Sequence, residues 1–128
     1  YLLRDSSFPQ NSYSQVGDHD YGNNRYSTSN DPNSNWDPAA VSAIHNSKIT
    51  HDYFLNIHGR DSIDDNGMPI TSLVNVTNDD GQPFFNAYWN AGMMWFGTGA
   101  DSSENLAIAL DVTGHEFTHG VIENTSNL

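Results

Sequence analysis

The most informative segment of this sequence is Asp111-Val112-Thr113-Gly114-His115-Glu116-Phe117-Thr118-His119-Gly120-Val121. Its centre is an H-E-x-x-H motif formed by His115, Glu116 and His119. Residues four apart lie on one face of an α-helix, so the two imidazoles can bind one zinc ion. Glu116 is rotated by about 100° around the helix axis, which directs its carboxylate toward a zinc-bound water and not toward the metal. The spacing therefore predicts a zinc site in which Glu116 accepts a proton from that water.

The residues around the motif predict a helix over about residues 105–124. This segment is apolar on most of its sides, through Leu106, Ala107, Ile108, Ala109, Leu110, Val112, Val121 and Ile122. A helix that is apolar nearly all round is usually buried. A pair of surface or core histidines is the alternative interpretation, since the three fixed positions occur by chance in roughly one such sequence in a hundred.

A second helix is predicted upstream of the motif, over Pro38–His58. Asp37 can cap its first turn, where Pro38 is well tolerated, and Gly59 can adopt the left-handed conformation that ends a helix. Side chains recur at four-residue spacing along one face, at Val41, His45, Ile49, Tyr53 and Ile57, with Ile44 beside them. This spacing predicts that the face they form is buried.

The remaining segments contain strand and turn signals. Residues 70–77 alternate between apolar and polar side chains, which predicts a half-buried strand. Residues 84–89 and 93–96 are rich in aromatic side chains and predict a pair of strands around Asn90-Ala91-Gly92, followed by a loop at 97–101. Residues 1–36 are polar and turn-rich, so we expect mostly irregular structure there, with short strands near residues 1–3 and 26–28.

The composition excludes several classes of protein. The 128 residues suffice for one compact domain and contain no apolar run of the roughly 18–20 residues that a membrane span needs. Four basic residues against sixteen acidic ones give a formal net charge of −12, which argues against a nucleic-acid partner. The sequence has no cysteine, which excludes disulfides and thiolate metal ligands. The acidic residues are mostly Asp among Asn, Ser and Gly, which fits either calcium binding or simple solubility.

Several segments together resemble the thermolysin-like neutral zinc metalloproteases. The motif helix resembles the active-site helix of that family, and Asn86-Ala87-Tyr88-Trp89 resembles its substrate-binding edge strand. Residues 93–99, Met-Met-Trp-Phe-Gly-Thr-Gly, are similar to the stretch that follows that strand, and residues 49–60 are similar to the end of the family's long first helix. The matches keep the family's order over residues 37–128, whereas residues 1–36 match only loosely. The resemblance implies an α+β fold, a sheet-rich N-terminal subdomain with one amphipathic helix and a buried H-E-x-x-H helix at its C-terminal end.

The resemblance implies a role for each polar residue of the motif helix. His115 and His119 would bind Zn²⁺, and Glu116 would be the catalytic base. Asp111 matches an aspartate that helps to bind Ca²⁺ in the family, although it could instead orient a ligand or supply a charge at the helix N-terminus. Four further histidines are expected to have no metal role: His19, His45, His51 and His58.

The resemblance also implies a site for a peptide or protein substrate. Asn86 would hydrogen-bond the peptide backbone, and the main-chain carbonyl of Ala87 would accept from a peptide N–H, so that the peptide extends the sheet. Tyr88 and Trp89 would either contact the substrate or be ordinary core aromatics. Val112 would line the pocket for the residue after the scissile bond, which implies cleavage on the amino side of bulky apolar residues.

Two histidines do not complete a catalytic zinc site, which uses three protein ligands and a water. The resemblance places the third ligand, a glutamate, beyond Leu128 in a C-terminal helical domain. Residues 1–128 are therefore expected to be the N-terminal subdomain of a secreted bacterial zinc metalloendopeptidase, inactive without that partner domain. Two alternatives remain: a non-catalytic fragment that binds zinc and peptides, and an acidic calcium-dependent extracellular protein with a chance motif.

Overall fold

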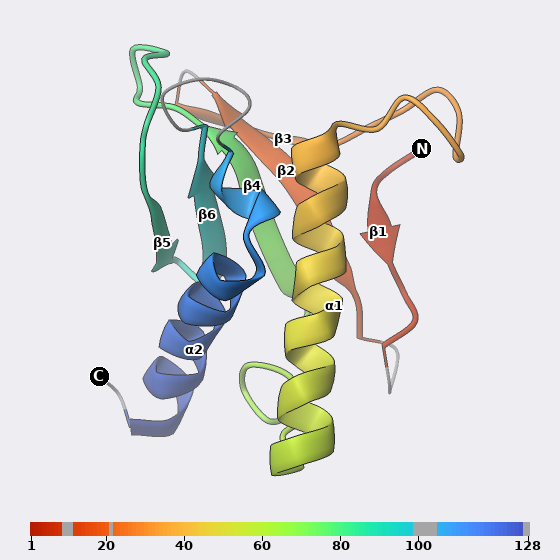
Figure 1. Cartoon of the computed structure of the whole chain (residues 1–128), viewed down its shortest axis with the longest axis vertical. Coiled ribbons are helices and arrows are strands. Elements are labelled where there is room, and N and C mark those ends of the chain that lie inside the picture. Colours follow the sequence, from red (N-terminus) through yellow and green to blue (C-terminus); the bar gives the residue numbers. More distant parts are fainter. Residues whose placement is uncertain (9–11, 21, 99–104, 127–128) are drawn as a thin grey trace.

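The computed structural model describes residues 1–8, 12–20, 22–98 and 105–126 (Figure 1). Its elements along the chain are β1 (Arg4–Asp5), β2 (Ser14–Asp20), β3 (Asn23–Tyr26), α1 (Pro38–His58), β4 (Ile70–Val76), β5 (Ala87–Asn90), β6 (Met93–Gly97), the 3₁₀ turn η3 (Leu106–Ile108) and α2 (Leu110–Ser126). None of the helices in these ranges is long and apolar enough to cross a membrane.

The strands form one mixed six-stranded sheet in the order β1-β2-β4-β6-β5, with β3 paired to β2. Strands β2, β4 and β6 run parallel to one another, whereas β5 is antiparallel to β6. Both helices cover the same face of the sheet, α1 over β2 and β4, and α2 over β5 and β6 (Figure 1). Strand β5 is the last in the order, so one of its edges is open in the described part of the chain and runs beside α2.

Helix α1 has the predicted ends but not the predicted buried face. The Asp37 side chain accepts a hydrogen bond from the Ala39 N–H at 2.9 Å, and Gly59 ends the helix at a φ of 63°. The prediction that this face is buried is wrong, because its side chains at positions 41, 45, 49, 53 and 57 are all exposed. The buried face consists of small and polar side chains: Ala39, Ala40, Ala43, Asn46, Ser47, Thr50 and His51.

Small side chains are buried on α1 because they let the helix lie close to the sheet. The hydroxyls of Ser47 and Ser72 lie 3.4 Å apart, which places the backbone of α1 near β4. Large side chains at these positions would hold the two elements apart. The apolar face of α1 therefore points away from the sheet, and its side chains remain exposed.

Strand β2 was not predicted, although it lies inside the sheet between β1 and β4. Its only large apolar side chain is Val16, so the hydrophobic pattern of a strand is absent. Gly17 is required where β2 pairs with β3, because a Cβ at this position would lie 2.4 Å from the carbonyl oxygen of Arg25. The expectation of mostly irregular structure over residues 1–36 is wrong in this segment. The short strands expected near 1–3 and 26–28 are seen slightly displaced, as β1 and β3.

The predicted pair of strands is confirmed as β5 and β6, although β5 covers Ala87–Asn90 and not residues 84–89. Its two turn residues, Ala91 and Gly92, have positive φ values of 53° and 76°, as a type I′ turn requires. The predicted strand over 70–77 is present as β4. Gly97 belongs to β6 and not to the predicted loop, and the rest of that loop from residue 99 lies outside the described residues.

The motif helix begins later than predicted. Residues 106–108 form η3, Ala109 is extended, and α2 starts at Leu110. The side-chain amide of Asn46 in α1 donates to the carbonyls of Ala107 and Ile108 at 3.0 and 3.3 Å. These carbonyls are thus satisfied from outside the helix, which permits the break at Ala109. Nor is α2 buried all round, because Leu110 and Ile122 are exposed.

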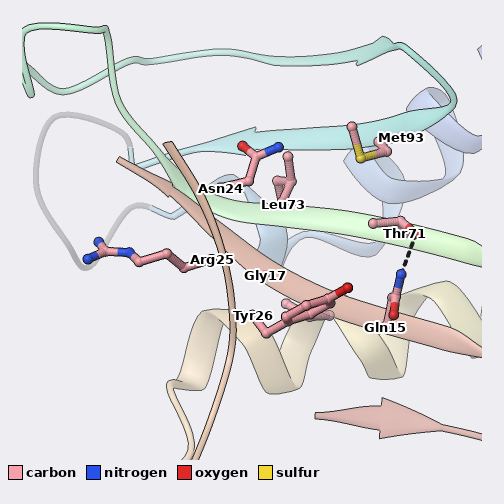
Figure 2. A pocket seen from close by; sticks show the side chains of 9 residues that line it. Gln15, Gly17, Asn24, Arg25, Tyr26, Thr71, Leu73 and Met93 are labelled. Carbon is pink, nitrogen blue, oxygen red and sulfur yellow. Dashed lines mark hydrogen bonds between the residues drawn. The ribbon is translucent and has the colours of Figure 1, made fainter. Parts of the chain in front are cut away.

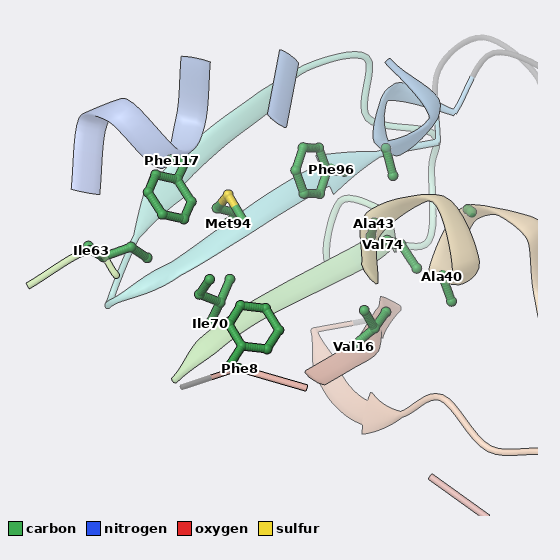
Figure 3. Packing of buried hydrophobic residues seen from close by; sticks show 12 residues of the cluster. Phe8, Val16, Ala40, Ala43, Ile63, Ile70, Val74, Met94, Phe96 and Phe117 are labelled. Carbon is green, nitrogen blue, oxygen red and sulfur yellow. The ribbon is translucent and has the colours of Figure 1, made fainter. Parts of the chain in front are cut away.

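The main hydrophobic core lies between the sheet and the helices (Figure 3). Its largest fully buried apolar side chains are Phe96, Phe117, Ile63, Ile70 and Met94. Phe117 points from α2 into this core, which fixes the rotation of the helix and turns the side chains at positions 115 and 119 outward. A smaller cluster around Leu73, Val76 and Trp95 covers the opposite face of the sheet.

Candidate active site

The two histidines of α2 converge on one point. The Nε2 atoms of His115 and His119 lie 3.1 Å apart, with ring centroids 4.8 Å apart, and both side chains are exposed. Two nitrogen ligands of one tetrahedral zinc ion, each at 2.0–2.1 Å, are separated by about 3.3 Å. The predicted pair therefore fits two positions of a single zinc ion.

Glu116 lies on the inner side of the histidine pair. Glu116 is only 5% exposed, and its carboxylate accepts no hydrogen bond from the described residues. It contributes to the lining of both hollows that flank His115. A carboxylate in this position is an available proton acceptor at the wall of the cleft.

Two hollows lie between β5 and α2, and together they form one cleft. The first has a volume of about 420 Å³ and is lined by Phe85, Asn86, Ala87, Leu106, Asp111, Val112, His115 and Glu116. The second, of about 250 Å³, is lined by Ala87, Tyr88, Trp89, His115, Glu116, His119 and Glu123. They share Ala87, His115 and Glu116, so the sheet edge and the motif meet at the centre of the cleft.

The backbone of β5 offers hydrogen-bonding groups along this cleft. The Gly97 N–H donates to the Asn86 carbonyl at 2.8 Å, so Asn86 faces β6. Backbone groups alternate in direction along a strand, and those of Ala87 and Trp89 therefore face the open edge. The Asn86 side-chain oxygen accepts from the Ala87 N–H at 2.8 Å, which leaves the Ala87 carbonyl as the outward acceptor.

The two aromatic residues that follow Ala87 lie on opposite faces of the sheet. The ring of Tyr88 stacks on Trp95 at 5.4 Å, on the sheet face that α2 does not cover. Burial raises the pKa of the Tyr88 phenol, and the charge of Asp79 adds to this effect. Trp89 faces α2 instead, and its indole Nε1 donates to Glu123 at 2.5 Å.

Val112, which the resemblance places in a pocket for an apolar side chain, lines the first hollow, and Leu106 also lines it. Sequence reasoning missed two further lining residues, Phe85 and Glu123. Phe85 is 66% exposed in the structure, and its place directly before Asn86 is the one sequence signal that points to it. Glu123 continues the four-residue spacing of the two histidines along α2.

Asp111 is exposed in the first turn of α2, where its side chain accepts a hydrogen bond from the Val112 N–H at 3.0 Å. Within the described residues, no three acidic or histidine side chains are grouped so that they could hold a metal ion. Calcium binding by Asp111 therefore stays a prediction. The remaining histidines lie on other elements, in β2 and along α1, away from the motif pair.

A further hollow lies on the sheet face that carries Leu73 and Met93 (Figure 2). Its volume is about 350 Å³, and Arg25 is the one charged residue among those that line it. Gln15 and Thr71 hydrogen-bond to each other within it at 3.2 Å. No residue of the H-E-x-x-H motif contributes to this hollow, so it is separate from the cleft beside α2.

Comparison with known proteins agrees with this geometry. A family model described as "Thermolysin metallopeptidase, catalytic domain" matches residues 1–123. The chain is 40% identical over 97 residues to a bacillolysin of Bacillus cereus, which covers 75% of this chain and 16% of that protein. It is 41% identical over 96 residues to an extracellular metalloprotease of Pectobacterium carotovorum subsp. carotovorum, which covers 74% of this chain and 26% of that protein.

Among solved structures, the chain resembles the precursor of protealysin, a metalloproteinase from Serratia proteamaculans. The TM-score is 0.72 at 28% sequence identity, and the match covers 97% of this chain and 38% of that chain. The α+β, sheet-rich fold predicted from the sequence is thereby confirmed. The chain spans about a quarter or less of the length of the two curated relatives.

Proposed function

The chain belongs to the thermolysin metallopeptidase family, and on that premise we propose that it is the N-terminal part of a zinc-dependent endopeptidase. The observation that carries the proposal is the meeting of three features in one cleft. These are the paired Nε2 atoms of His115 and His119, the carboxylate of Glu116 at the wall of the cleft and the open edge of β5. By analogy with its extracellular bacterial relatives, we propose that the enzyme acts outside the cell.

His115 and His119 would hold the zinc ion, which supplies Lewis-acid polarisation and a water of lowered pKa when it is bound. Glu116 would accept a proton at its carboxylate and later donate it to the leaving amine. Burial of Glu116 keeps this carboxylate at the wall of the cleft and limits its contact with bulk water. The third zinc ligand would come from the part of the enzyme outside this chain.

The substrate would be an extended peptide that adds to the open edge of β5. The Ala87 carbonyl would accept a hydrogen bond from the peptide, and the Asn86 amide would turn toward the peptide backbone. Val112 and Leu106 in the first hollow would receive an apolar side chain, which supports cleavage before bulky apolar residues. The ring of Tyr88 would contribute only indirectly, because it packs on the other face of the sheet.

A C-terminal helical domain of the same enzyme would cover the apolar face of α1. The uncovered side chains of this face include Val41, Ile49, Tyr53 and Ile57. Between α1 and α2, a hollow of about 380 Å³ continues this surface toward Leu110. Exposed apolar patches of this kind mark interaction sites. The covered share of the protealysin precursor, 38%, leaves ample chain in such enzymes for a second domain.

Hydroxyl-radical labelling tests the packing of this second domain. Tyr53 is 53% exposed in this chain and is expected to be labelled several-fold less in the complete enzyme. Tyr26, which is 61% exposed on a different part of the sheet, serves as the control. Equal labelling of Tyr53 in the two proteins would mean that the second domain does not cover this face.

Hydrolysis assays on the complete enzyme and on this chain test the function itself. Zinc-loaded complete enzyme is expected to cleave a peptide before a leucine, to lose that activity in a chelator and to regain it when zinc is added. The isolated zinc-loaded chain is expected to bind zinc without cleaving the peptide, because only two protein ligands are available. Activity that survives complete removal of zinc would refute the proposed function. Cleavage by the isolated chain would refute only its dependence on a partner domain.

A further inference from the structure

The contact between Trp89 and α2 joins the two sides of the cleft. Trp89 lies on β5, and Glu123 lies on α2, 34 residues further along the chain. The indole Nε1 donates to the Glu123 Oε2 at 2.5 Å, in a hydrogen bond that is exposed to solvent. This hydrogen bond lies at the wall of the second hollow, together with His115 and His119.

Gly120 provides the space into which the Trp89 ring fits. A Cβ on Gly120 would lie 2.9 Å from the ring atom Cη2 of Trp89 and 2.9 Å from Cγ2 of Ile63. A side chain at position 120 would therefore displace the Trp89 ring, the Ile63 side chain or α2 itself. Gly120 and Glu123 are three residues apart and so lie on neighbouring turns of one helix face. Together they hold the indole ring and its N–H.

Movement of Trp89 would be transmitted directly to the peptide-binding edge. Ala87 and Trp89 are two residues apart on β5, so their side chains both face α2 and their backbone groups both face the open edge. The position of the Ala87 carbonyl relative to the histidine pair thus depends on how Trp89 sits against α2. The two histidines both lie on α2, so their mutual distance does not depend on this contact.

From these contacts we infer that Glu123 and Gly120 are positioning residues, which set the distance between the peptide-binding edge and the metal-binding histidines through Trp89. The inference rests on the proposed function, since it concerns the same cleft. It assigns Trp89 a role as a spacer between β5 and α2. Glu123 continues the four-residue spacing of the two histidines along α2, but its carboxylate accepts a hydrogen bond from the Trp89 indole.

The test uses the 128-residue chain and compares the variants Glu123→Ala and Glu123→Gln. The alanine variant removes the acceptor for the Trp89 N–H, whereas glutamine keeps an acceptor oxygen and removes the charge. Asp80→Ala, in the exposed turn before β5, is the control for the loss of one negative charge. For each protein we would measure the dissociation constants of zinc and of a blocked leucine-containing tetrapeptide bound to the zinc-loaded chain.

The indole ¹H–¹⁵N resonances report the hydrogen bond directly. Trp36 donates to the Pro32 carbonyl and Trp95 donates to the Asn90 carbonyl, so both resonances serve as internal references. In Glu123→Ala the Trp89 resonance is expected to shift upfield, while the two references stay in place. In Glu123→Gln and in the Asp80→Ala control, the Trp89 resonance is expected to shift only slightly.

The dissociation constants of the peptide and of zinc are expected to change by different factors. Glu123→Ala should weaken peptide binding about three- to tenfold, as the loss of one hydrogen bond implies, and should change zinc affinity less than about twofold. Glu123→Gln should bind the peptide nearly as well as the wild-type chain. Unchanged peptide binding in Glu123→Ala, or an equal loss of zinc and peptide binding, would overturn the positioning role. A wild-type chain that bound zinc but not the peptide would overturn the proposed peptide-binding role of the β5 edge, and this inference with it.

Discussion

Replacement of Glu116 by glutamine in the complete enzyme is expected to lower peptide hydrolysis by about 10²- to 10⁴-fold, the range that a general base contributes. Glutamine has nearly the same shape but cannot accept the proton. Because the His115 and His119 rings are held by α2 and not by Glu116, the zinc content should stay at the wild-type level. The measurement pairs the rate of peptide cleavage with metal analysis of the same sample.

The control for this variant is Asp80→Asn, which neutralises an exposed carboxylate in the turn before β5. Its rate and zinc content should both match the wild-type enzyme. An enzyme with Glu116→Gln that still turned over at more than about a tenth of the wild-type rate would exclude Glu116 as the base. Loss of zinc together with activity would instead assign Glu116 to metal binding.

Replacement of Gly97 by alanine is expected to have the largest effect on stability. A Cβ at this position would lie 1.8 Å from the Phe84 carbonyl oxygen and 2.7 Å from the Asn86 carbonyl oxygen. Both neighbours are backbone atoms, so a side-chain rotation cannot relieve the overlap. The chain entering β5 would have to separate from β6, and the free energy of unfolding should fall by at least about 4 kcal/mol. Urea denaturation followed by circular dichroism measures this change.

Gly114→Ala is the matched control, since a Cβ at Gly114 meets no atom within 4 Å. Gly114 lies within α2, where alanine has the higher helix propensity, so this variant should be more stable by about 0.5–1 kcal/mol. If Gly97→Ala were as stable as the wild-type chain, the close approach of residues 84–86 to the end of β6 would be wrong.

The parts of the fold predicted from the sequence are those with strong local signals. The cap at Asp37, the stop at Gly59 and the turn at Ala91 and Gly92 each depend on a few neighbouring residues. The H-E-x-x-H motif is equally local, because helix geometry alone brings His115 and His119 together. Such features need no knowledge of the partners that surround them.

The predictions that proved wrong depend on packing between distant segments. The apolar spacing along α1 indicated a buried face, but the sheet side of α1 carries Ala43 and Ser47, since a close approach selects for small residues. Strand β2 has almost no hydrophobic pattern because hydrogen bonds to strands on either side hold it in place. The contact of Trp89 with Glu123 joins two segments 34 residues apart, which no local pattern reveals.

The most direct test of the central claim is the position of bound zinc in crystals of this chain or of the complete enzyme, located from anomalous scattering at the zinc absorption edge. We expect a single strong peak within about 2.0–2.1 Å of the Nε2 atoms of both His115 and His119. The peak should be absent from crystals of His119→Ala grown under the same conditions. A zinc ion bound elsewhere, with the two imidazoles left unoccupied, would contradict the assignment of α2 as the metal-binding helix.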